Sequence, residues 1–111
     1  MLARPDSYIP PVDIVRDQDG AYVILMDIPG MTREQIKLSR QNVVTIVKGT
    51  RENDHTEREI ATEVTRQERK TGEFTMTFRI PEEYNRRWDS VTVQDGVLEI
   101  RYLKDHDEEE T

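Results

Sequence analysis

Side chains that could act as nucleophiles or general bases are few and lie far apart in this sequence. The two histidines are His55, within a run of charged residues, and His106, within an acidic terminus, so we interpret both as solvated side chains. The three serines, Ser7, Ser39 and Ser90, lack the Gly-x-Ser-x-Gly spacing that presents a catalytic nucleophile. The sequence therefore favours a protein that is not an enzyme.

Paired carboxylates and metal ligands are equally poorly supported. Glu82 and Glu83 are adjacent and follow Pro81, an arrangement more typical of a solvated turn than of a catalytic acid–base pair. The acidic terminus lacks the spaced ligands and the glycine of a calcium-binding loop. The chain contains no cysteine, which removes thiolate chemistry and Cys-ligated zinc. We predict no metal site and no cofactor.

The elements that would have to position any functional residue are strands. The 111 residues are enough for one domain. The hydrophobic share is only 34%, and within it Val and Ile number 19 whereas Leu and Ala number 8. Side chains branched at Cβ lose rotamer freedom in a helix and fit the pleated surface of a sheet. The composition therefore predicts an all-β protein with a small core.

Charge is distributed unevenly along the chain. The net charge is −7, and five acids fall within residues 105–111, so we predict that this segment is a disordered, solubilising tail. The negative sign disfavours nucleic-acid binding, because phosphates require basic partners. No signal peptide and no apolar run long enough for a membrane span is visible. Together with the absence of cysteine, these features predict a cytoplasmic protein with no membrane association.

Short alternating strands and turn signals recur along residues 12–104, after an extended lead-in at residues 1–11. Asp95-Gly96 between two apolar runs is the strongest hairpin signal. The spacing predicts an antiparallel, immunoglobulin-like β-sandwich of about seven or eight strands. The strands are expected at 12–15, 21–28, 36–40, 43–48 (closed by Gly49), 73–80, 90–94 and 97–103. Which face of the 43–48 strand points inward is left open, because a one-residue slip exchanges the faces.

The segment 50–71 interrupts this pattern. Eleven of its 22 residues are charged, and they surround one apolar island at Ile60–Val64. A structureless loop of this length is unusual in a compact domain. The segment is therefore functional, disordered or paired elsewhere.

Four pieces of the sequence, in register over about ninety residues, resemble the α-crystallin domain of the small heat-shock proteins. They are Val23–Met31, Glu34–Leu38, Gly72–Pro81 and Asp95–Leu98. The resemblance covers about residues 12–104 and implies an ATP-independent chaperone (a holdase) that binds unfolding client proteins and prevents their aggregation. The chain departs from the family in having no C-terminal Ile-x-Ile motif.

The resemblance also implies a peptide-binding groove and a dimer. In the family a groove lies between two edge strands, and its walls correspond here to Ile36, Leu38, Val91 and Val93. The alternative for these four residues is a purely structural place in the core. The family's loop strand adds to a second subunit, which here predicts a homodimer in which Ile60, Ala61, Thr62 and Val64 contact Val12, Ile14 and Val15 of the other chain. The alternative is a solvated loop on a monomer.

Two other functions remain as alternatives. A CS-domain co-chaperone shares the sandwich and docks on a large ATP-dependent chaperone, but such domains tend to carry an early tryptophan and to lack the long loop. Here Trp88 is the only tryptophan and lies late in the chain. A carbohydrate-binding sandwich could use Trp88 as a ligand platform, but a hydrophobic cap on the core is the favoured interpretation of this residue.

Overall fold

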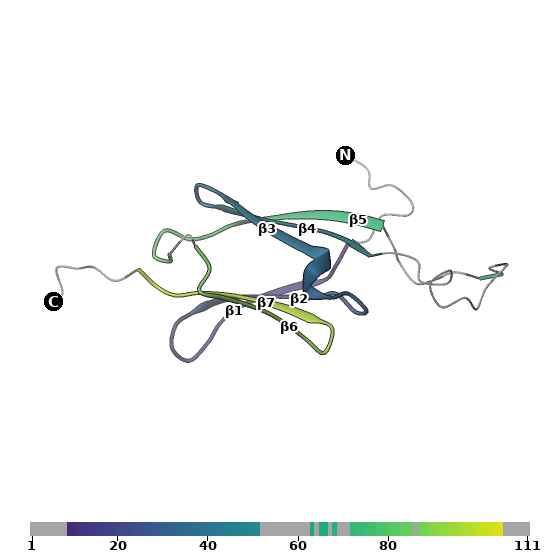
Figure 1. Cartoon of the computed structure of the whole chain (residues 1–111). Helices are drawn as coiled ribbons and strands as arrows, with labels where there is room; N and C mark the ends of the chain where they lie inside the picture. The colour runs from purple at the N-terminus through teal and green to yellow at the C-terminus, as the bar shows by residue number, and fades with distance from the viewer. Residues whose placement is uncertain are drawn as a thin grey trace.

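The computed structural model describes residues 9–51, 63, 65–66, 68, 72–85 and 87–105. Within these ranges seven strands form two antiparallel sheets that pack face to face (Figure 1). One sheet has the order β1-β2-β7-β6 and the other has the order β3-β4-β5. The predicted all-β sandwich is therefore confirmed. In chain order the elements are β1 (Val12–Arg16), β2 (Tyr22–Asp27), the 3-10 helix η1 (Arg33–Gln35), β3 (Ile36–Gln41), β4 (Val44–Arg51), β5 (Gly72–Arg79), β6 (Ser90–Gln94) and β7 (Val97–Tyr102).

Turn chemistry explains where the hairpins reverse. Asp95 and Gly96 have φ angles of 54° and 77°, so both central residues of the β6–β7 turn lie in the left-handed region that this tight hairpin requires. In the β1–β2 turn, one carboxylate oxygen of Asp17 accepts hydrogen bonds from the N–H groups of Asp19 and Ala21, each at 2.9 Å. The Ala21 bond and a contact with Arg101 lower the pKa of the Asp17 carboxyl. Both turns fall where the sequence predicted them.

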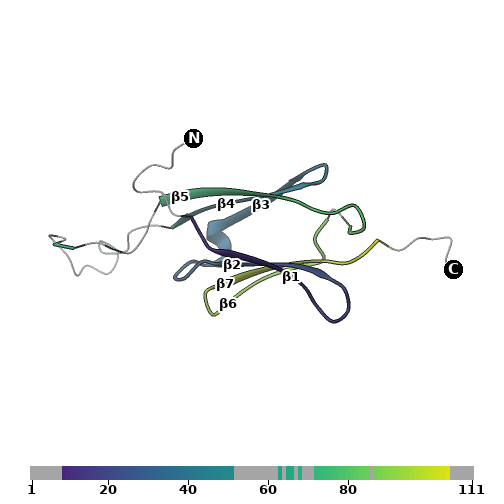
Figure 2. The ribbon, with the colours of Figure 1, turned by 180° about the vertical axis from the view of Figure 1, so that it is seen from behind.

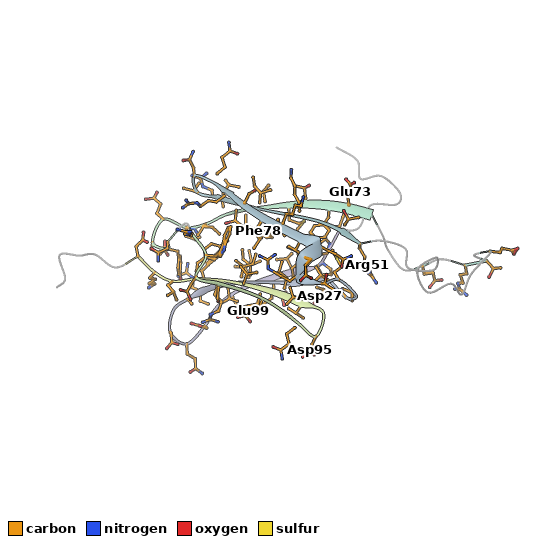
Figure 3. The ribbon with its side chains drawn as sticks, viewed as in Figure 1. Asp27, Arg51, Glu73, Phe78, Asp95 and Glu99 are labelled. Atoms are coloured by element: carbon orange, nitrogen blue, oxygen red, sulfur yellow. The ribbon has the colours of Figure 1, made fainter. Side chains whose placement is uncertain are left out.

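Alternate residues of β4, β5 and β7 supply much of the core, whereas β2 is buried on both faces. Leu98, Ile100 and Tyr102 of β7 are fully buried between the sheets, as is expected for one face of a strand with a two-residue period. Figure 3 shows Phe78 directed into the space between the sheets, whereas Glu99 lies on the outer side of its sheet. The alternation that identified the strands in the sequence therefore also sorts buried from exposed side chains.

The structure settles which face of β4 points inward. Val47 is fully buried and pairs with Leu38 of β3 and Met76 of β5, whereas Val44 and Ile46 are only half-buried. The inward face also carries Thr45, which is fully buried despite its hydroxyl group. Pairing of a buried hydroxyl with a partner is the rule in folded proteins, and the partner of Thr45 comes from the opposite sheet.

Gly49 lies inside β4, and the prediction that it closes the strand is wrong. The strand continues to Arg51, and Gly49 pairs with Ile36 on one side and with Phe74 on the other. A Cβ atom at this position would lie 2.7 Å from Cζ of Phe74 and 3.0 Å from Cδ1 of Ile36. Glycine is therefore required here by close packing and not by a turn.

The connector between β5 and β6 closes one end of the sandwich. Tyr84 is fully buried, and its hydroxyl donates a hydrogen bond to the carbonyl oxygen of Gly20 at 2.8 Å. Its ring lies 5.2 Å from that of Tyr22, which in turn lies 6.1 Å from that of Tyr102. The first of these aromatic contacts attaches the connector to β2, and the second joins β2 to β7.

Candidate functional site

The edges of the two sheets come together in pairs. β3 ends one sheet and β6 ends the other, and both lie on the side nearer the viewer in Figure 1. β1 and β5 are the opposite edges and lie nearer the viewer in Figure 2. An edge strand presents backbone N–H and C=O groups without ladder partners, so each pair of edges offers a place where an extended segment can add.

The four predicted groove residues border the core at the β3–β6 margin. The side chain of Ile36 is 3% exposed and belongs to the core, whereas Leu38, Val91 and Val93 are half-buried and pack against it. Val91 pairs with Ile100 and Val93 with Leu98, so both valines are on the inward face of β6. Three of the four side chains thus combine contact with the core and partial exposure, the combination that an apolar groove wall requires.

The apolar margin ends in a polar cavity. Arg40 follows Ile36 and Leu38 at two-residue spacing on β3 and borders a cavity of about 440 Å³. Trp88 also lines this cavity and packs against the core, in agreement with its interpretation as a hydrophobic cap. The lining residues that the structure describes come from β3, from the β5–β6 connector and from the segment after β7, namely Arg40, Asn85, Arg87, Trp88, Asp89 and Asp105. Sequence reasoning found only Trp88 among them, because no local motif joins three distant segments.

The opposite edge carries exposed apolar side chains. In β1, Ile14 is 47% exposed and Val15 is 43% exposed, while Val12 is half-buried against the core. Among the described residues β1 has β2 as its one strand partner. The residues predicted to cover this edge from a second subunit, Ile60, Ala61, Thr62 and Val64, lie outside the described residues.

Catalytic and metal-binding chemistry finds no centre in the described part of the chain. No group of three or more His, Cys, Asp or Glu side chains gathers within the described ranges. Ser39, Glu82 and Glu83 are exposed, and Ser90 is half-buried at the start of β6. His55, His106 and Ser7 lie outside the described residues. No helix in the described ranges is long and apolar enough to cross a membrane.

Comparison with known families agrees with this architecture. The sequence profile described as the Hsp20/alpha crystallin family matches residues 14–111. The chain belongs to the Hsp20/alpha crystallin family. The resemblance seen in the four sequence pieces is thereby confirmed, and the two-sheet sandwich is the α-crystallin domain of this Hsp20 protein.

Relatives of this Hsp20 chain occur in plants and bacteria. It is 33% identical over 95 residues to the 17.7 kDa class II heat shock protein of Arabidopsis thaliana, an alignment that covers 85% of this chain and 60% of that protein. It is 28% identical over 97 residues to the small heat shock protein ibp of Buchnera aphidicola, covering 85% of this chain and 62% of that protein. The chain thus spans about three-fifths of the length of these curated relatives.

Solved structures share the Hsp20 fold. The hspA protein of Xanthomonas axonopodis superposes with a TM-score of 0.71 at 28% identity, covering 88% of this chain and 95% of that one. A small heat-shock protein of Xylella fastidiosa, described as having a distinct high order structure, superposes with a TM-score of 0.77 over 91% of this chain and 90% of that one. Its identity is 24%, so this second comparison bears on the fold alone.

Proposed function

We propose that this protein is an ATP-independent chaperone, a holdase that binds unfolding client proteins and prevents their aggregation. The observation that carries the proposal is the half-buried apolar margin formed by Leu38, Val91 and Val93 between two sheet edges. Membership of the Hsp20 family and kinship with heat shock proteins support the same role. No cofactor is needed, because the binding energy comes from burying apolar surface.

The mechanism follows from what an unfolding client exposes. A partly unfolded chain presents extended apolar segments, and such a segment can pair its backbone with a strand edge while alternate side chains enter the groove. Leu38, Val91 and Val93 would receive these side chains at the β3–β6 margin. Aggregation is slowed because the client segment most able to pair with another chain is covered by the chaperone instead.

We infer that the working unit is a homodimer. The exposed Ile14 and Val15 of β1 support this inference, because a soluble protein rarely leaves an apolar strand edge uncovered. In the proposed dimer, Ile60–Val64 of each chain adds to Val12–Val15 of the other, an exchange that covers two edges by one symmetric interface.

We place the protein in the cytoplasm. The absence of cysteine supports this location, since it suits a reducing compartment. Fractionation of cells that express a tagged copy of the chain tests it.

The test of the chaperone proposal is the aggregation of a heat-sensitive client, such as citrate synthase, followed by light scattering. We expect scattering to fall as the protein is added, and unchanged scattering at molar excess would refute the proposal. Val93→Lys introduces a charge into the groove and should weaken protection, because burying an unpaired charge is costly. Thr92→Lys adds the same charge to the exposed neighbour of Val93 on β6 and serves as the matched control.

A further inference from the structure

The two walls of the groove change from apolar to charged at the same level. On β3, Arg40 is on the inward face, because it pairs with the fully buried Thr45. On the other wall, the N–H of Asp89 donates to the carbonyl oxygen of Arg101 at 2.7 Å, although Arg101 is already the ladder partner of Ser90. Asp89 and Ser90 thus both lie opposite Arg101, as in a β-bulge at the start of β6, and Asp89 lines the cavity beside Trp88. Arg40 and Asp89 therefore border the same cavity from opposite sheets.

The charged side chains that line this cavity in the described part of the chain carry both signs and are available to a ligand. Arg87 and Asp105 join Arg40 and Asp89 in its lining, so the described residues contribute two guanidinium groups and two carboxylates. Among the described residues none of these four side chains takes part in an ion pair. Arg101 differs from them, because its guanidinium group forms an ion pair with the carboxylate of Asp17. A bound side chain would thus meet both signs of charge.

This arrangement discriminates between side chains that enter the cavity. A carboxylate would be attracted by Arg40 and repelled by Asp89, and an ammonium group would experience the reverse. An apolar side chain would remove water from charged groups without replacing their hydrogen bonds. A carboxamide can accept from the guanidinium and donate to the carboxylate at the same time. Its methylene groups can lie against the indole of Trp88.

We propose that the cavity is a subsite for an amide side chain, glutamine or asparagine, two residues away from an apolar pair in the bound segment. The inference rests on the proposed function and specifies the class of client segment that the groove prefers. The spacing follows from β3 itself, where Ile36, Leu38 and Arg40 are each two residues apart on one face. An extended segment in the groove repeats that spacing, so its third inward side chain reaches the cavity.

The experiment measures the affinity of labelled peptides by fluorescence anisotropy. Each peptide of the first set has the pattern Ile-x-Ile-x-Z, in which Z is Gln, Glu, Lys or Leu. A second set has the reversed pattern Z-x-Ile-x-Ile, because the bound segment can run in either direction. With the unaltered protein we expect the Gln peptide of one set to bind about fivefold more tightly than its Glu, Lys and Leu counterparts, the effect of about one additional net hydrogen bond. Its affinity should change little with salt, because no net charge is paired.

Two variants give the lining of the cavity a net charge, and each should change which peptide binds most tightly. Arg40→Gln leaves the carboxylates in excess, so the Lys peptide should become the tightest ligand. Asp89→Asn leaves the guanidinium groups in excess, so the Glu peptide should become the tightest. The affinity of the Arg40→Gln variant for the Lys peptide and that of the Asp89→Asn variant for the Glu peptide should both fall with added salt. Arg40 and Asp89 are exposed, so neither change removes a core contact, and circular dichroism checks the fold.

The outcomes separate this inference from the proposed function. If the Ile-x-Ile peptides bind but rank the same in all three proteins, or if Leu ranks first with the unaltered protein, the amide subsite is refuted while the groove stands. If none of the peptides binds to the unaltered protein, the groove itself is refuted and the subsite with it.

Discussion

The hydroxyl groups of Thr45 and Tyr102 lie 2.6 Å apart in the interior and connect the two sheets by a hydrogen bond. Thr45 belongs to β4 and Tyr102 to β7, and both side chains are fully buried. One hydroxyl donates to the other, so each of these two buried oxygens has a hydrogen-bond partner. The pair also fixes the position of one sheet relative to the other, because a hydrogen bond depends on distance and angle far more than an apolar contact does.

Thr45 and Tyr102 should be energetically coupled. Thr45→Val or Tyr102→Phe alone leaves one buried hydroxyl unpaired and should lower the free energy of unfolding by about 1–3 kcal/mol. The free energy of unfolding of the double variant should fall by less than the sum of the two single losses, because neither hydroxyl remains. Urea denaturation of the four proteins measures the coupling. Tyr84→Phe removes a different hydrogen bond, to Gly20, and combined with Thr45→Val should be additive.

Stability should fall in strong alkali partly because of Tyr102. Burial raises the pKa of its phenol to about 12, from an ordinary value near 10. The folded state therefore holds this proton more firmly than the unfolded state does. The contribution of the protonated phenol to the free energy of unfolding is complete below pH 10 and is lost as the pH rises towards 12. Two pKa units correspond to about 2–3 kcal/mol. The free energy of unfolding of Tyr102→Phe should decline less steeply over this interval, and parallel profiles for the two proteins would contradict the assignment.

Gly49→Ala should destabilise the domain by about 1–3 kcal/mol, as overpacking of a core does. The added methyl group would lie 2.7 Å from Cζ of Phe74, in the middle of β4. Phe74→Leu shortens that side chain and should recover part of the loss in the double variant. Thermal unfolding of the three variants measures this, and a Gly49→Ala protein with unchanged melting temperature would show that the ring of Phe74 moves away freely.

Dimer formation should depend on the apolar island in the 50–71 segment. Ile60→Pro removes a backbone donor and restricts φ, so it should prevent Ile60–Val64 from adding to a strand of the second subunit. We expect the variant to be a monomer at micromolar concentration by native mass spectrometry, with Ile60→Val remaining dimeric as the matched control. A dimeric Ile60→Pro protein would mean that another surface forms the interface.

The sequence predicted those features that depend on neighbouring residues. Asp95-Gly96 was sufficient for the last hairpin, because positive φ at adjacent positions is a local demand on residue type. The facing of β4 was not predictable, because Thr45 is placed inward by a partner 57 residues further along the chain. Gly49 was misinterpreted for the same reason, since the ring that requires it belongs to β5. Local signals cannot report contacts that exist only after the sheets have paired.

The same limit applies to the candidate site. Leu38, Val91 and Val93 were placed at a groove by resemblance to a family, and their alternation on strands was visible directly. The polar cavity beside these residues was missed, because the sequence shows Arg40 and Asp89 only as ordinary charged residues near the ends of strands. Their significance arises from the cavity that they share.

The position of β7 in its sheet has a consequence for synthesis of the protein. β7 is the last of the described strands to be made, yet it lies between β2 and β6, and Tyr22 of β2 pairs with Tyr102 at its end. A nascent chain still attached to the ribosome before Tyr102 has emerged lacks the complete strand whose Ile100 and Leu98 lie beside Ile24 and Met26 in the sheet. The larger sheet therefore cannot form vectorially from the N-terminus, and it closes only after nearly the whole domain has left the exit tunnel.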